Sequence, residues 1–211
     1  MTSLFPMFLK LAGKQCLVVG AGRVSEAKIA GLVDTDAAIH VVALEAGGQV
    51  REWADEGKIA LELRAFFPSD LDGKFLAVVA TASSSLNDLI YREAQRRGVL
   101  CNVVDVPHLC DFFYSAVVRR GDLQIAISTA GQSPSLAQRI RQQLEKRFGQ
   151  GYADWVERLG ETRRLVLASA LDKETKSELL HSLASNEAFE AALAKLPESG
   201  PKELTAKGGE A

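Results

Sequence analysis

The stretch Gln15–Lys28, which reads QCLVVGAGRVSEAK, decides the fold. Its run of Leu and Val has no polar break, which is typical of a parallel strand covered on both faces by helices. Gly20 and Gly22 then allow a tight turn and a close backbone approach, through which the first N–H groups of a helix can point at a pyrophosphate. The pattern is G-x-G-x-x-S, with Ser25 where Gly or Ala is usual. It predicts a dinucleotide site or an ordinary strand-to-helix turn, and its place at the start of a βαβ-sized unit favours the dinucleotide site.

Around this stretch the composition is that of a soluble globular protein. The 211 residues are 47% apolar and 25% charged, with a net charge of -2. This length suits one α/β domain of about 150 residues plus a smaller region. Nothing in the charge balance indicates general attraction to nucleic acid. The apolar N-terminus is interrupted at Lys10 before it reaches membrane-spanning length, so we expect no membrane contact and a cytoplasmic protein.

The cysteines Cys16, Cys101 and Cys110 form no CxxC pair, and two of them lie in apolar, strand-like runs. Buried reduced thiols are therefore favoured over metal ligands or a disulfide. We predict no resident metal site from these residues.

The first hundred residues alternate between strand and helix patterns, which predicts an α/β, Rossmann-like parallel sheet. Expected strands cover residues 6–11, 15–20, 38–44, 59–63, 75–80 and 99–104, and expected helices cover 24–33, 49–57 and 86–97, with a turn or short helix at 68–72. No glycine follows the first helix, so Asp36 is expected in a left-handed conformation, which Asp tolerates better than most residues.

Further candidates for cofactor binding lie at the ends of the expected strands. Arg23 and Val24 open the first helix directly after the glycines. Glu45 follows the second long strand, where a carboxylate can hold the adenine ribose or be merely solvated, and no arginine follows at once to receive a 2′-phosphate, so NAD is favoured over NADP. Thr81 and Ser83 follow another apolar strand, where they can meet the cofactor, cap the next helix, or do both.

The strand at 99–104 ends in Asp105, with Pro107 and His108 close behind. An aspartate at this edge of the sheet can be a general base or a turn former, and the residues leave both open. His108 can assist metal delivery or be an ordinary loop histidine.

Beyond residue 112 the organisation changes. Residues 113–119 and 123–128 predict a β-hairpin, and Ser133 with Pro134 starts a helix that runs to about residue 148. The polar loop 128–133 therefore leads into a helix N-terminus, a second potential anion site. Helices are expected at 152–170, 173–183 and 187–196. We expect domains at 1–112, 113–149 and 150–196, with a disordered tail at 197–211.

With these segments in view, the chain resembles the precorrin-2 dehydrogenase and sirohydrochlorin ferrochelatase family, the N-terminal module of siroheme synthases. The resemblance covers about residues 4–195 and rests on the segments Pro6–Leu9, Val18–Val24, Cys101–Asp105 and Ala126–Pro134. The motif Asn-Val-Val-Asp at residues 102–105, followed by Ser-x-x-Gly-x-Ser-Pro at residues 128–134, is far more specific for this family than the glycine pattern alone.

The resemblance implies a fold and an activity. It implies an NAD-linked Rossmann-like domain, a dimerisation hairpin and helix that build a homodimer, and a small all-α C-terminal domain. In this family NAD-dependent oxidation of precorrin-2 yields sirohydrochlorin, and many members also insert ferrous iron to give siroheme. The methyltransferase module of the fused enzymes is expected to be absent from a chain of this length. The alternatives are a non-catalytic Rossmann protein that senses NAD or a tetrapyrrole, and a structural partner of another enzyme.

The resemblance also implies roles for single residues. Asp105 matches the family's strand-end general base, which is consistent with the proton loss that accompanies hydride loss or metal insertion. Ser128, Thr129 and the helix start after Ser133 are expected to meet substrate carboxylates, helped by Arg119, Arg120 or Arg139, although these arginines can equally be solvated or lie at the dimer contact. Thr129 also aligns with a serine that is phosphorylated in some members.

This sequence departs from the family pattern near the cofactor site. Ser25 and Ala27 replace the usual Ala and Arg of the first helix, whereas Lys28 is retained. Ala82 and Ser83 stand where two acidic residues are common, and Ser115 stands where Pro is frequent. We expect these changes to affect NAD affinity more than the fold.

Overall fold

The structure, a computed structural model, describes residues 4–194 and divides the chain into two compact units that meet between Tyr114 and Ser115. The first unit ends two residues beyond the expected end of the Rossmann-like domain; the finer division of the second part stays a prediction. The expected tail at 197–211 lies outside the described residues.

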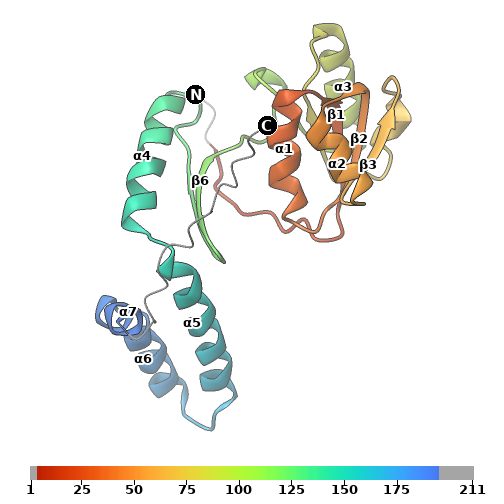
Figure 1. The fold of residues 1–211 in the computed structure, drawn as a ribbon. Coiled ribbons are helices and arrows are strands. Elements are labelled where there is room, and N and C mark those ends of the chain that lie inside the picture. Colours follow the sequence, from red (N-terminus) through yellow and green to blue (C-terminus); the bar gives the residue numbers. More distant parts are fainter. Residues whose placement is uncertain (1–3, 195–211) are drawn as a thin grey trace, which may run out of the picture. The chain divides into compact units, whose positions relative to one another are not determined.

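The first unit is a five-stranded parallel sheet with the strand order β3-β2-β1-β4-β5. Figure 1 labels β1, β2 and β3 of this sheet together with the helices α1, α2 and α3. Its strands are β1 (Gln15–Ala21), β2 (Ala38–Ala46), β3 (Ala60–Leu63), β4 (Leu76–Val79) and β5 (Leu100–Val103). Its helices are α1 (Arg23–Val33), α2 (Gly48–Asp55) and α3 (Ser84–Arg97), with short 3₁₀ turns η1 (Pro68–Leu71) and η2 (Pro107–Leu109). The chain builds the sheet outward from β1 in one direction and then crosses to β4 on the other side. The carboxyl end of β1 therefore lies at the topological switch point, where ligands bind in such sheets.

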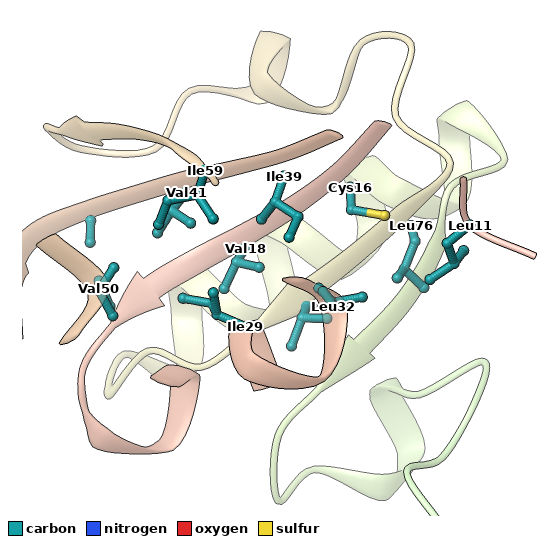
Figure 2. Close-up of a cluster of buried hydrophobic side chains, with 13 residues drawn as sticks. Leu11, Cys16, Val18, Ile29, Leu32, Ile39, Val41, Val50, Ile59 and Leu76 are labelled. Atoms are coloured by element: carbon teal, nitrogen blue, oxygen red, sulfur yellow. The ribbon is translucent and has the colours of Figure 1, made fainter. Parts of the chain in front are cut away.

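The unbroken apolar run of β1 is explained by burial on both faces of the sheet. Cys16 and Val18 belong to one core, shared with Ile29 and Leu32 of α1 (Figure 2). The intervening Leu17 belongs to the opposite core, which includes Ile90 of α3. Because successive side chains point to opposite faces, the buried positions Cys16–Val19 of this strand are all apolar.

Most expected elements of this unit are confirmed within one to three residues, but the strand expected at 6–11 is wrong. This segment forms no strand, and Phe5, Met7 and Phe8 are 80%, 62% and 68% exposed. Apolar composition favours a strand only where a neighbouring edge supplies hydrogen bonds and a surface to pack on, and only Leu11 reaches the core. Asp36 has φ 54, so its predicted left-handed conformation is confirmed. Cys16 and Cys101 are buried as predicted, while Cys110 is partly buried.

The second unit contains a hairpin and a set of helices (Figure 1). Strands β6 (Ala116–Arg120) and β7 (Leu123–Ile127) are antiparallel, so the predicted hairpin is confirmed, although its first strand starts at 116 rather than 113. Helix α4 (Pro134–Arg147) packs on both strands, and α5 (Gly151–Ala168) contacts α6 (Lys173–Leu183) and α7 (Asn186–Leu193). Aromatic rings join α5 to α7, with the Tyr152 and Phe189 centroids 4.1 Å apart. Among residues 4–194, no helix is long and apolar enough to cross a membrane.

Candidate functional site

The two glycines between β1 and α1 meet different requirements. Gly20 has φ +104, and a Cβ there would overlap the carbonyl oxygen of Ala80, the residue directly after β4. Gly22 has an extended backbone with φ -83, and a Cβ there would meet nothing within 4 Å. Gly20 is therefore required for packing of the turn, whereas Gly22 leaves the approach to the helix open.

The start of α1 has the properties of an anion site. Gly22 is its N-cap residue and offers no side-chain oxygen, so within residues 4–194 no N-cap side chain accepts from the first N–H groups of the helix. These groups carry the positive end of the helix dipole. The open side of Gly22 gives a ligand access to them, and this arrangement fits the pyrophosphate of a dinucleotide.

Ser25 lies beneath this turn and does not line its open side. The residue is 1% exposed, and its Oγ is 3.3 Å from the position that a Cβ of Gly20 would take. Within the described residues this hydroxyl has no hydrogen-bond partner. A buried hydroxyl without a partner costs about 1–3 kcal/mol. Serine in place of the usual alanine at this position therefore lowers the stability of the fold below the glycine turn.

The other predicted cofactor residues surround the same edge of the sheet. Arg23 and Val24 are exposed in the first turn of α1. Glu45 is exposed near the end of β2, one residue before Ala46, which pairs with Ala21 of β1. Their contacts with a cofactor stay predictions.

Thr81 and Ser83 carry internal hydrogen bonds. The Thr81 hydroxyl donates to Oδ1 of buried Asn87 at 2.7 Å, and the Asn87 amide donates back to the Thr81 carbonyl at 3.3 Å. Ser83 is the N-cap of α3, with its Oγ accepting from the N–H of Leu86 at 3.3 Å. The helix-capping role of Ser83 is confirmed, while the cofactor role of both residues stays a prediction.

Asp105 lies on the turn that follows β5. The Val106 N–H donates to the Val103 carbonyl at 3.1 Å, and Asp105 has φ 62. Asp105 is exposed. Because parallel strands end at one edge of the sheet, this turn lies on the same edge as the glycine turn after β1. The turn-forming role of Asp105 is confirmed by this hydrogen bond and this φ, while its role as a general base stays a prediction.

Lys28 and Tyr114 add a cation and a phenol that were not among the predicted site residues. The Lys28 Nζ lies 3.9 Å from the centroid of the Tyr114 ring. Burial lowers the pKa of Lys28, and the negative charge of Asp105 acts in the opposite direction. Burial also raises the pKa of Tyr114 to about 12. The negative charge of Asp105 therefore acts on the half-buried ammonium of Lys28 on α1. The sequence feature that could have pointed to Lys28 is its retention from the family pattern.

In the second unit, the loop 128–133 is held by its own hydroxyls. The Ser128 Oγ accepts from the Ala130 N–H at 3.1 Å, and the Thr129 Oγ1 accepts from the Ser133 N–H at 3.1 Å. Ala130 and Gly131 both have positive φ, 50 and 79. Ser133 caps α4 as predicted, accepting from the Leu136 N–H. Ser128 and Thr129 remain able to donate their own hydroxyl protons to a substrate.

The structure separates Arg119 and Arg120 from this loop. In the hairpin register Arg119 pairs with Gln124, four residues before Ser128, which corresponds to about 13 Å along a strand. The Arg120 guanidinium donates to the carbonyls of Phe148 and Glu145, at 2.7 and 3.0 Å, and so caps the C-terminal end of α4. Arg120 would have to leave these carbonyls to bind a substrate, so its substrate role stays a prediction that the geometry disfavours.

Two family models match the chain. Residues 7–116 match a family described as putative NAD(P)-binding, and residues 120–147 match one described as sirohaem biosynthesis protein central. The chain belongs to the putative NAD(P)-binding family. The first match spans the sheet with the glycine turn and Asp105, and the second spans most of the hairpin and α4.

Individual relatives agree with this family. A siroheme synthase of Nitrosococcus oceani is 41% identical over 147 residues, which are 70% of this chain and 31% of the relative. Siroheme synthase 2 of Yersinia pseudotuberculosis is 34% identical over 197 residues, which are 89% of this chain and 42% of the relative. The chain thus spans between about a third and two fifths of the length of these curated relatives.

A solved structure extends the similarity to almost the whole chain. SirC, described as a precorrin-2 dehydrogenase, superposes with a TM-score of 0.77 at 28% identity, covering 92% of this chain and all of that chain. The predicted fold, a Rossmann-like domain followed by a hairpin and helices, is confirmed by this similarity.

Proposed function

We propose that the protein oxidises precorrin-2 to sirohydrochlorin with NAD as the hydride acceptor. The observation that carries the proposal is the exposed Asp105 on the same sheet edge as the open glycine turn and the uncapped N-terminus of α1. The similarity to SirC over the length of both chains supports this reaction, as do the siroheme synthase relatives.

NAD, when bound, would supply a nicotinamide that takes a hydride from the tetrapyrrole. Gly22 and the first N–H groups of α1 would hold the pyrophosphate, and Glu45 would accept hydrogen bonds from the adenine ribose. A carboxylate at Glu45 would also repel a 2′-phosphate, which favours NAD over NADP.

Asp105 would act as the general base. Oxidation removes one hydride and one proton from the substrate, so a group beside the reacting carbon must accept the proton. The Asp105 carboxylate would accept it and release it to water after turnover. The half-buried ammonium of Lys28 would attract the acidic side chains of the tetrapyrrole to this edge.

The remaining assignments belong to the same proposal. The hairpin and α4 would build a homodimer, and Ser128, Thr129 and Arg119 would contact substrate carboxylates. Insertion of ferrous iron into sirohydrochlorin would be a second reaction, in which Asp105 accepts protons from the pyrrole nitrogens. The naming of the relatives as siroheme synthases supports this second reaction.

The test is a spectrophotometric assay with purified protein, NAD and precorrin-2. We expect sirohydrochlorin absorbance to appear with the wild type and not with Asp105→Asn, while both bind NAD equally in a titration. Addition of ferrous iron to sirohydrochlorin, with and without protein, tests the second reaction. NAD binding without turnover by the wild type would favour a sensor over an enzyme.

A further inference from the structure

The turn that presents Asp105 has a left-handed backbone and makes several contacts with its surroundings. Asp105 is the third residue of a turn closed by the Val106 N–H and the Val103 carbonyl, at 3.1 Å, and its φ is 62. Glycine or asparagine usually occupies this position in a turn with positive φ. Aspartate tolerates this conformation better than most residues but less well than glycine, so neighbouring contacts can decide how firmly the turn is held.

The thiol of Cys110 makes such contacts on both sides of Asp105. Its Sγ lies 3.1 Å from the carbonyl oxygen of Val103 and 3.3 Å from that of Val106. The single thiol hydrogen is therefore shared between the two carbonyls that flank the turn. Burial raises the pKa of the Cys110 thiol, so the proton needed for these contacts is retained at neutral pH.

The segment around Cys110 is itself fixed to the sheet. Cys110 forms a bridge with buried Asn102, whose amide donates to the Cys110 Sγ at 3.4 Å and to the Phe112 carbonyl at 2.7 Å. The Asp111 carboxylate accepts from the Cys101 N–H at 2.9 Å and from the Gln95 amide at 2.7 Å. The thiol is thus anchored to β5 and α3 and is not carried by a loose loop.

We infer that Cys110 is a positioning residue, which holds the 103–106 turn so that the Asp105 carboxylate keeps one orientation toward the substrate. The effect on the substrate rests on the proposed function. The hydrogen bonds by which Cys110 holds the turn are a property of the fold and do not depend on that function. Cys110 touches no reacting atom in this scheme. Its contribution is to keep the base in place, where small displacements are costly to rate.

The test compares Cys110→Ala, Cys110→Ser and Cys16→Ala in the full chain. Cys16→Ala is the matched control, because it removes a buried thiol near the start of β1, level with Leu76 and Leu100 in the sheet register, whereas the turn follows Val103 at the other end of β5. We expect Cys110→Ala to lower kcat for precorrin-2 oxidation about tenfold or more, with unchanged NAD affinity. Cys110→Ser should recover part of the rate, because a hydroxyl can still donate to one carbonyl. Cys16→Ala should change kcat by less than about twofold, because the mutated site is independent of the turn.

Hydrogen exchange of the peptide covering residues 103–110 is the readout that does not depend on turnover. We expect faster exchange there in Cys110→Ala than in the wild type or in Cys16→Ala. Unchanged exchange in Cys110→Ala would refute the claim that Cys110 holds the turn. Faster exchange with an unchanged kcat would show that holding the turn does not position Asp105 for the reaction. If the wild type gives no turnover, the proposed function fails, and the exchange experiment still decides whether Cys110 holds the turn. Should the alanine variant not fold, Cys110→Ser gives a smaller effect in the same direction, because its hydroxyl can donate to only one of the two carbonyls, and wild-type exchange in this variant would then overturn the inference.

Discussion

Alanine at Gly20 and alanine at Gly22 should have opposite consequences, although both glycines belong to one motif. At Gly20 the added Cβ would overlap the Ala80 carbonyl oxygen and come within 3.0 Å of the carbonyl carbon, at a φ of +104. At Gly22 it would enter open space at a φ of -83. We therefore expect Gly20→Ala to destabilise the first unit and Gly22→Ala to weaken NAD binding with little effect on stability.

The magnitudes follow from these contacts. A side chain in a sparsely populated backbone region costs about 1–3 kcal/mol, and overpacking against a backbone that cannot move away costs about 1–3 kcal/mol more. Gly20→Ala should therefore lower the free energy of unfolding by about 2–6 kcal/mol, a large part of the total of a typical domain. In Gly22→Ala the N-cap glycine is replaced by a slightly less favourable N-cap residue, so the free energy of unfolding should stay within about 1 kcal/mol of the wild-type value.

Urea denaturation followed by tryptophan fluorescence can report the first unit alone. The sequence has two tryptophans, of which Trp53 packs against the core of the first unit and Trp155 lies on α5 of the second. A Trp155→Phe background leaves Trp53 as the single reporter. NAD titration of the same proteins measures the second effect, and we expect the dissociation constant of Gly22→Ala to rise about tenfold, or about 1.4 kcal/mol.

A wild-type urea midpoint for Gly20→Ala would refute the packing argument, because the overlap with Ala80 would then be relieved at no cost. Equal NAD affinity for Gly22→Ala and the wild type would refute the assignment of its open side to the pyrophosphate.

Three further predictions concern buried and charged groups. Ser25→Ala removes the unpartnered hydroxyl and should raise the free energy of unfolding by about 1–3 kcal/mol in the urea titration; a loss of stability would reveal a partner for that hydroxyl. Asp105→Asn keeps a residue that tolerates positive φ, so stability should be unchanged while turnover falls at least about a hundredfold, and retained turnover would exclude Asp105 as the base. Burial alone would raise the pKa of Asp70, but hydrogen bonds from Arg64 and the Phe67 N–H lower it overall. Its stabilising contribution is therefore present above the ordinary aspartate pKa of about 4 and is lost as the pH falls through the lowered value. Urea midpoints between about pH 6 and pH 2 should fall less steeply in Asp70→Asn, and parallel curves would contradict this.

Much of the fold can be predicted from the sequence because the local patterns agree with the tertiary packing. The apolar run of β1 reflects burial on both faces, and the helices that begin at Ser84 and Pro134 follow the serine caps Ser83 and Ser133. The segment at 6–11 was mispredicted because its composition says nothing about whether a sheet edge is available to pair with it.

The candidate site was less predictable, because its properties depend on contacts between distant segments. Nothing around Gly20 indicates that the carbonyl of Ala80, sixty residues away, excludes a side chain there. Likewise, the two arginines of the hairpin suggested anion binding, whereas Arg120 donates to the carbonyls at the far end of α4. The role of Cys110 follows from three-dimensional hydrogen bonds that its position five residues after Asp105 does not indicate.

The left-handed backbone at Asp105 has a consequence for how this protein can change over time. Among replacements for aspartate, asparagine and glycine suit a positive φ best, and each is a single base change away from an aspartate codon. Both would remove the carboxylate while leaving the turn relaxed and the glycine site intact. Under the proposed mechanism, either replacement would abolish the oxidation and leave a folded protein that still binds NAD. Descendants that became dedicated binders would be expected to carry one of these two residues at the end of β5.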